Sequence, residues 1–179
     1  MTSYKSLLPF VAGLMLSGIA HPAAANDVME TRTFISSPDA VWNAWSDPEL
    51  VRQWWGPTGF TAPKVEMNFE IGSSTLVCMQ AEGTPLMCNT WTYTAIQPET
   101  ELRFDSRFAS EDGTAVAAAA AGLPPGVPDV VPHRITFEPT EAGGTLMTVH
   151  ETGYTTPEAA ELSAQGLSQV LDKMQALVP

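Results

Sequence analysis

Basic residues are scarce in this sequence of 179 residues, where 8 lysines and arginines stand against 20 aspartates and glutamates and give a formal net charge of −12. Nucleic-acid binding depends on clustered Lys and Arg, so this composition argues against a DNA or RNA partner. The same repulsion disfavours anionic membrane surfaces. Hydrophobic residues still make up 44% of the chain and charged residues only 16%, which is typical of one folded domain and not of a disordered acidic segment.

Motifs for common chemistries are also missing from the sequence. There is no G-x-S-x-G elbow, H-E-x-x-H pair, C-x-x-C pair, phosphate-binding glycine loop or dinucleotide fingerprint. The two cysteines have no neighbouring histidine and would be two ligands short of a tetrahedral metal site. We therefore expect no cofactor, no metal and no catalytic residue, although an enzyme is not excluded by composition alone.

Histidine is rare as well, and only His133 and His150 lie beyond the first 25 residues. A metal site built on this pair would need carboxylates, and Glu151 is the only adjacent candidate. In a regular strand the side chain of Glu151 points to the opposite face from that of His150. Structural roles are therefore expected for both histidines in preference to a functional one.

The first 25 residues have the layout of a secretory signal. A short start with Lys5 precedes an apolar run over 6–20, and small residues lead to an expected cut between Ala25 and Asn26. The alternative is an uncleaved membrane anchor, but the apolar run is about 15 residues long and a spanning helix needs about 20. We expect a periplasmic or secreted protein with no membrane span after cleavage.

Cleavage would remove 25 of the 179 residues and leave 154 in a single domain, residues 26–179. Because Lys5 would be lost with no acidic residue, the formal charge would change from −12 to −13.

Export also affects the interpretation of Cys78 and Cys88, which flank a turn-like segment at 81–85. A hairpin centred there would place them opposite each other, so a disulfide is predicted, with two buried reduced thiols as the alternative.

Periodicity predicts one strand, two short helices, about six antiparallel strands and a long C-terminal helix. Proline after a capping residue indicates the helix starts at Pro38, Pro48 and Pro157, with Ser37 and Thr156 as N-caps. The expected strands cover 28–36, 64–69, 75–80, 86–96, a segment around 102–104, 133–137 and 145–152, and the last helix runs to about Leu177.

Residues 112–132 interrupt this pattern. The segment contains five consecutive alanines and several prolines, and it is apolar and longer than an ordinary connection. We interpret residues 112–132 as an inserted flap.

The segment 41–60, VWNAWSDPELVRQWWGPTGF, together with this order of elements, resembles the AHSA-type proteins of the SRPBCC (START-like) superfamily. These are related to an activator of the ATPase of the ninety-kilodalton heat-shock chaperone. The resemblance implies an α+β helix-grip fold, with a curved antiparallel sheet of six to seven strands around the C-terminal helix and a cavity between them. The chain departs from the family in its signal peptide, its flap, and Leu167, which stands where a Trp is common.

Trp42 and Trp45 are expected in the core, whereas Trp55 and Phe60 are candidates for the mouth of the cavity. Polar anchors for a ligand are sought at Tyr93, Arg103 and His150. The alternative is that side chains fill the whole space and leave a solid core. The remaining candidates for the cavity lining are Met67, Phe69, Trp91, Phe104, Leu167, Leu171 and Met174.

The leading functional hypothesis is an exported, non-catalytic protein that binds a small apolar or amphipathic molecule. A chaperone-activating interaction domain is an alternative, but a cytosolic chaperone and its ATP would not be available to an exported protein. A third alternative is an enzyme acting on a hydrophobic substrate in the same cavity.

Overall fold

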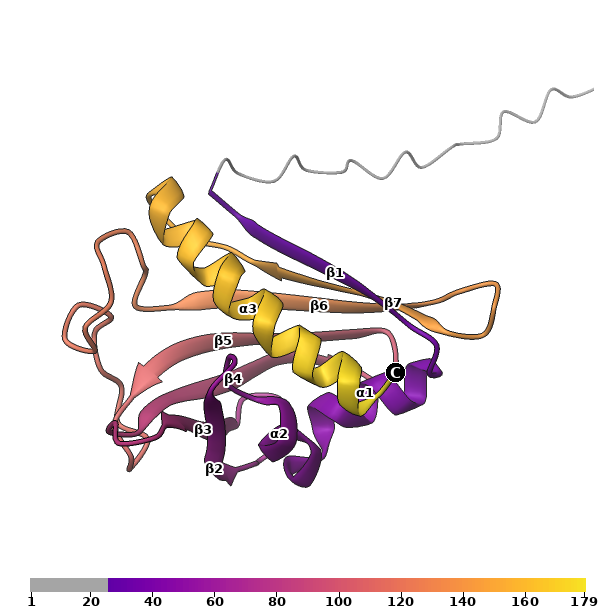
Figure 1. Cartoon of the computed structure of the whole chain (residues 1–179), viewed down its shortest axis with the longest axis horizontal. Helices are drawn as coiled ribbons and strands as arrows, with labels where there is room; N and C mark the ends of the chain where they lie inside the picture. The colour runs from indigo at the N-terminus through magenta and orange to yellow at the C-terminus, as the bar shows by residue number, and fades with distance from the viewer. Residues whose placement is uncertain (1–25) are drawn as a thin grey trace, which may run out of the picture.

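The computed structural model describes residues 26–179, so the predicted signal peptide lies outside the described residues. Seven strands form one antiparallel sheet in the order β1-β7-β6-β5-β4-β3-β2, and the long helix α3 crosses one face of the curled sheet (Figure 1). This arrangement is the predicted α+β helix-grip fold. The elements are β1 Val28–Phe34, α1 Pro38–Ser46, α2 Pro48–Trp54, β2 Phe60–Glu66, β3 Ser74–Ala81, β4 Met87–Gln97, β5 Glu101–Ala109, β6 Val131–Pro139, β7 Thr145–Glu151 and α3 Pro157–Leu177.

Alternation along the strands divides the sheet into an inner face, which packs against the helices, and an outer face. On β4, the inner side chains Trp91 and Tyr93 are each 1% exposed, as the alternation predicts. The intervening Thr92 lies on the outer face, where its hydroxyl is 2.8 Å from the hydroxyl of Ser74. The hydrophobic period of two therefore determines which side chains face α3.

The helix starts follow the proline and capping signals. Thr156 accepts a hydrogen bond from the backbone N–H of Ala159, and Pro157 occupies the first turn of α3. Asp47 caps α2 through the N–H of Glu49 at 2.8 Å. Ser37 is the N-cap residue of α1, although its side chain makes no capping hydrogen bond. Within residues 26–179 no helix has the length and apolar character needed to cross a membrane.

A disulfide joins Cys78 of β3 to Cys88 of β4, as predicted. The two residues are direct partners in the β3–β4 register. Both side chains are buried in a small cluster with Leu76, against which Leu86 and Ala109 pack. This cluster is separate from the main core and ties the hairpin together close to the point where the flap leaves β5.

One strand lies earlier in the chain than predicted, at Phe60–Glu66 instead of 64–69. The alternation of Val65, Met67 and Phe69 predicts a strand to residue 69, but β2 ends at Glu66. The N–H of Asn68 bonds to the side-chain oxygen of Thr75 at 3.3 Å, so the chain there leaves the regular ladder. Met67 and Phe69 are still half-buried and pack against the main core.

Tryptophan rings from α1 and α2 fill the centre of the inner face. Trp42 is 7% exposed and Trp45 is 2% exposed, which confirms the expectation that both belong to the core. The rings of Trp45 and Trp54 lie edge to face with centroids 4.8 Å apart, and the indole N–H of Trp54 donates to the carbonyl of Ala44 at 2.8 Å. The Trp45 ring also lies 6.1 Å from that of Trp91 and 6.2 Å from that of Phe104, so these rings fill the inner face of the sheet there.

Candidate ligand-binding cavity

A cavity of about 220 Å³ lies at the end of the fold where the flap and the N-terminal half of α3 meet. Both elements lie at the left of Figure 1, away from the C-terminus. Segments that are far apart in the sequence contribute its wall, from the end of α2 to α3, which makes it a feature of the tertiary structure. The lining residues are Trp55, Pro57, Met79, Phe108, Leu123, Val127, Val131, Glu151, Tyr154, Ala159, Leu162, Ser163, Gly166, Leu167 and Val170.

The flap contributes Leu123 and Val127 to the cavity wall. Backbone hydrogen bonds hold the flap at both ends. The N–H of Val116 donates to the carbonyl of Phe108 on β5 at 2.8 Å, and the N–H of Thr155 donates to the carbonyl of Gly126 at 2.9 Å. Within the flap, the N–H of Ala118 donates to the side chain of Asp129 at 2.7 Å. The flap thus covers part of the cavity, whereas Leu162 on α3 is 47% exposed and marks its open side.

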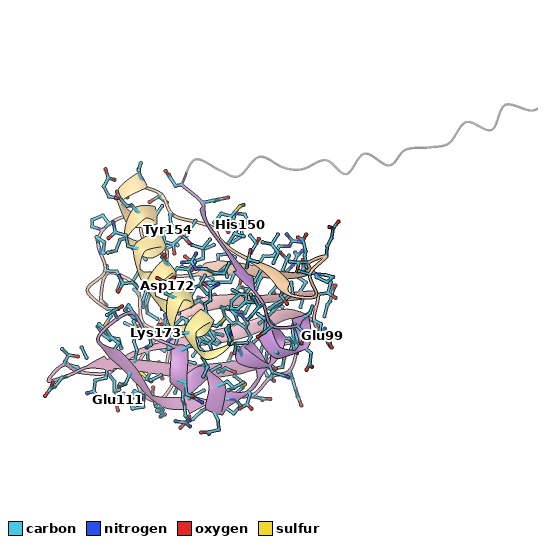
Figure 2. The ribbon with its side chains drawn as sticks, turned by 45° about the vertical axis from the view of Figure 1, so that its right-hand side comes forward. Glu99, Glu111, His150, Tyr154, Asp172 and Lys173 are labelled. Carbon is cyan, nitrogen blue, oxygen red and sulfur yellow. A yellow bond between two sulfur atoms is a disulfide. The ribbon has the colours of Figure 1, made fainter. Side chains whose placement is uncertain are left out.

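A buried carboxylate forms the centre of a polar cluster in this otherwise apolar wall. Glu151, the last residue of β7, is 5% exposed, and its Oε2 accepts hydrogen bonds from Tyr154 and Ser163, both at 2.7 Å. The two hydroxyl oxygens are themselves 2.6 Å apart. Figure 2 shows Tyr154 beside the N-terminal half of α3. The cluster thus links the end of β7 to this half of the helix.

His133 completes the cluster behind the cavity wall. Its Nε2 lies 3.0 Å from Oε1 of Glu151, and its Nδ1 lies 2.8 Å from the carbonyl oxygen of Val131. Both ring nitrogens therefore face oxygen acceptors, a geometry that suits a donor at each nitrogen. Burial raises the pKa of Glu151, but the charge of His133 and the hydrogen bonds outweigh it and hold this pKa below its usual value.

The carboxylate of Glu151 in turn changes the pKa of the neighbouring Tyr154 phenol. Burial raises the pKa of Tyr154, and the negative charge of Glu151 raises it further. Tyr154 therefore keeps its proton at neutral pH. Trp55 also lines the cavity, and its indole N–H is buried and has no hydrogen-bond partner among the described residues.

Most of the predicted cavity residues fill the core instead of lining the cavity. Trp55 and Leu167 line it. Leu171 and Met174, on the C-terminal half of α3, are fully buried, and Phe60 is half-buried at the start of β2. The predicted lining was displaced because the Trp45 and Trp54 rings occupy the inner face of the sheet. Packed core side chains include Trp91 and Phe104, whose rings stack at 5.1 Å, and Tyr93 with Phe69 at 4.8 Å.

None of the three predicted anchors reaches the cavity. Arg103 lies on the outer face of β5, where it pairs with Glu101 at 2.6 Å. His150 pairs with Asp27 at 3.0 Å and lies beside β1 in Figure 2. Tyr93 is buried, and its hydroxyl is 2.8 Å from that of Thr75. Burial raises the pKa of Tyr93 to about 12, so its phenol is a packed structural group.

The family model for "Activator of Hsp90 ATPase homolog 1-like protein" (AHSA1) matches residues 36–179 of the chain. The chain belongs to the AHSA1 family. No functionally curated protein matches it, so the family is the extent of this assignment.

Solved structures of AHSA1-like architecture resemble this AHSA1 domain throughout. A protein from Arthrobacter aurescens is 25% identical, with a TM-score of 0.71 and coverage of 86% of each chain. A protein from Chromobacterium violaceum is 24% identical, with a TM-score of 0.68 and coverage of 86% of this chain and 96% of that one. The AHSA1 protein from Silicibacter pomeroyi is 19% identical, with a TM-score of 0.68 and coverage of 84% and 96%. At these identities the likeness concerns the fold.

The sequence did contain a signal for the cluster that this AHSA1 domain places in its cavity wall. Glu151 alternates with the buried Met147 and Val149, so the period of two places a carboxylate on the inner face. The structure confirms that Glu151 and His150 point to opposite faces. By contrast, no local pattern links Ser163 to Glu151, because their contact depends on how α3 crosses β7. Within residues 26–179, no group of three His, Cys, Asp or Glu side chains is arranged to hold a metal.

Proposed function

We propose that this AHSA1-family protein is exported and binds one small, mainly apolar molecule in the cavity under the N-terminal half of α3, without altering it chemically. The observation that carries this proposal is the cavity of about 220 Å³, whose wall is apolar except for one compact polar cluster. Apolar cavities with a few polar groups are typical of binding sites for small molecules.

The size of the cavity limits the ligand. Drug-sized ligands occupy cavities of roughly 300–1,000 Å³, which is more than this protein offers. An apolar cavity of about 150 Å³ is already enough to take up benzene. A volume of about 220 Å³ therefore favours a ligand of about one substituted ring or a short branched chain.

The position of the cavity supports binding over a filled core. Its wall includes Leu162, a large apolar side chain that is 47% exposed, so a ligand could enter beside α3 without unfolding the sheet. We propose that the flap, residues 112–132, closes the other side of the entrance through Leu123 and Val127. A ligand there would replace water against apolar side chains, which is favourable by about 25 cal/mol per Å².

Export is the second part of the proposal. It rests on the signal-like residues 1–25, and the Cys78–Cys88 disulfide supports it because disulfides persist in oxidising compartments. We expect a periplasmic or secreted protein with no nucleic-acid partner, and the family description's chaperone activation is the alternative. Recovery of the protein in the cytoplasm with its first 25 residues intact would favour that alternative.

Isothermal titration calorimetry with toluene tests the binding function. The protein is purified after expression of the full chain, and Leu167→Trp places the larger side chain common in the family into the cavity wall. We expect toluene to bind the wild type and to lose at least tenfold in affinity for Leu167→Trp. Leu146→Trp, a matched change on the outer face of β7, should retain wild-type affinity. Absence of toluene binding to the wild type, or equal binding to Leu167→Trp, would contradict the proposal.

A further inference from the structure

The polar cluster in the cavity wall restricts the chemistry of the ligand. Glu151, Tyr154 and Ser163 all line the cavity, and the other lining side chains carry no hydroxyl, carboxyl, amide or amino group. A polar group on a bound molecule that meets this wall therefore meets these three residues or the indole of Trp55. Their hydrogen atoms and lone pairs decide which polar groups can be accommodated.

The cluster has more oxygen contacts than protons. Three short contacts link Tyr154 to Glu151, Ser163 to Glu151 and Tyr154 to Ser163, at 2.7, 2.7 and 2.6 Å. The two hydroxyls supply only two protons, and Glu151 supplies none when it is ionised. The arrangement with the most hydrogen bonds inside the cluster uses both protons there and still leaves one contact without a proton. Donation to a ligand would give up one of these short internal hydrogen bonds, whereas the hydroxyl oxygens retain lone pairs that can accept without such a loss.

The charge of the cluster is balanced without a ligand. His133 has oxygen acceptors at both ring nitrogens, the carbonyl of Val131 at 2.8 Å and Glu151 at 3.0 Å, so the geometry fits an imidazolium opposite a carboxylate. The pair is then neutral overall. A ligand cation would bring an uncompensated charge into an apolar cavity, which is costly.

We propose that the ligand is a neutral hydrogen-bond donor, an alcohol or phenol of about one ring, whose O–H donates to the hydroxyl oxygen of Ser163 or Tyr154. This inference rests on the proposed function and adds the class of ligand to it. A carboxylate or ketone has no hydrogen to give to the cluster, where it would meet lone pairs and the negative charge of Glu151. The other polar group of the cavity wall, the indole N–H of Trp55, is buried. A hydrocarbon would bind by burial alone and would leave the oxygen lone pairs unused.

Three probes of similar shape separate these classes. p-Cresol carries a donor, toluene carries no polar group, and 4-methylbenzaldehyde carries only an acceptor. Calorimetric titration of the full-chain protein product should give a three- to tenfold higher affinity for p-cresol than for toluene, because a neutral hydrogen bond contributes about 0.5–1.5 kcal/mol. The aldehyde should bind no better than toluene.

Variants then assign the preference to the cluster. Ser163→Ala and Tyr154→Phe each remove one hydroxyl, and both should reduce the p-cresol preference to less than twofold while toluene still binds. Ser168→Ala is the matched control, because Ser168 lies on the same helix but bonds to Arg32 at 2.8 Å and does not line the cavity. It should keep the wild-type preference. Circular dichroism checks folding, and either of the two cluster variants suffices if the other does not fold.

The outcomes distinguish this inference from the function on which it rests. Equal affinity for toluene and p-cresol, or a preference for the aldehyde, would overturn the donor assignment and leave the binding of apolar molecules intact. A p-cresol preference that survives in both cluster variants would overturn the assignment to Ser163 and Tyr154. Failure of all three probes to bind would overturn the proposed function itself.

Discussion

Gly166 allows the cavity to be tested through protein stability. This residue lies within α3 and lines the cavity, and a Cβ atom added there would meet nothing within 4 Å. Glycine in a helix interior costs about 0.8–1 kcal/mol relative to alanine. Because the added methyl group enters open apolar space, Gly166→Ala should raise the free energy of unfolding by about 1 kcal/mol. The midpoint Tm should rise by about 2–4 °C for a domain of this size.

A larger side chain at the same position separates stability from binding. Gly166→Leu adds an apolar side chain to the cavity and should keep at least the stability of Gly166→Ala, since burying such a side chain is worth about 1.5–3 kcal/mol. It should also abolish toluene binding. Thermal unfolding followed by circular dichroism gives the first quantity, and calorimetric titration gives the second.

Gly122 provides the matched control for this substitution. It is also surrounded by open space, but its φ is +84°, a conformation that L residues adopt at a cost of roughly 1–2 kcal/mol. Gly122→Ala should therefore lower the stability while Gly166→Ala raises it. A clear loss of stability for Gly166→Ala would mean that the position is tightly packed, and it would refute the cavity.

Three further predictions concern other parts of the chain. Replacing Cys78 and Cys88 together by serine should lower the free energy of unfolding by about 2–3 kcal/mol in urea titrations, because the disulfide closes a loop with a sequence separation of 10. The pKa of Glu151 is held below its usual value in the fold, so its contribution to stability is present above about pH 4.5 and is lost as the pH falls further. Glu151→Gln should therefore flatten the fall in Tm below pH 5. N-terminal sequencing of the exported protein should begin at Asn26.

Each of these predictions has a contradicting result. Equal urea midpoints for the oxidised wild type and the double serine variant would exclude a stabilising disulfide. An unchanged acid slope in Glu151→Gln would mean that this carboxylate titrates alike in the folded and unfolded chains. A first residue other than Asn26 would move or remove the predicted cleavage site.

The sequence was most informative where the structure depends on local patterns. Proline after a capping residue gave the starts of α2 and α3, and the period of two gave the inner positions of Trp91 and Tyr93. The hairpin that pairs Cys78 with Cys88 is also local, since its turn follows from the residues between them. In each case the determining interaction spans only a few residues of the chain.

The position of the cavity depends on contacts between distant segments, so it could not be predicted in the same way. Trp45 and Trp54 pack beside Trp91 and Phe104, which the sequence suggested as cavity lining, and the contact between the Trp45 and Trp54 rings depends on the angle between two helices. Arg103 and His150 were expected as anchors, but the alternation that buries Leu102 and Val149 places both on the outer face. Their polar side chains alone suggested Arg103 and His150 as ligand anchors, whereas their positions in the strand alternation predict that both point away from the cavity.

A crystal structure of the protein soaked with p-cresol tests the central claim most directly. The ring should lie between Trp55, Leu167 and Val170, with its hydroxyl group within hydrogen-bond distance of Ser163 or Tyr154. Binding of p-cresol at another place on the protein, with this cavity unoccupied, would contradict the claim that the space under α3 is the binding site.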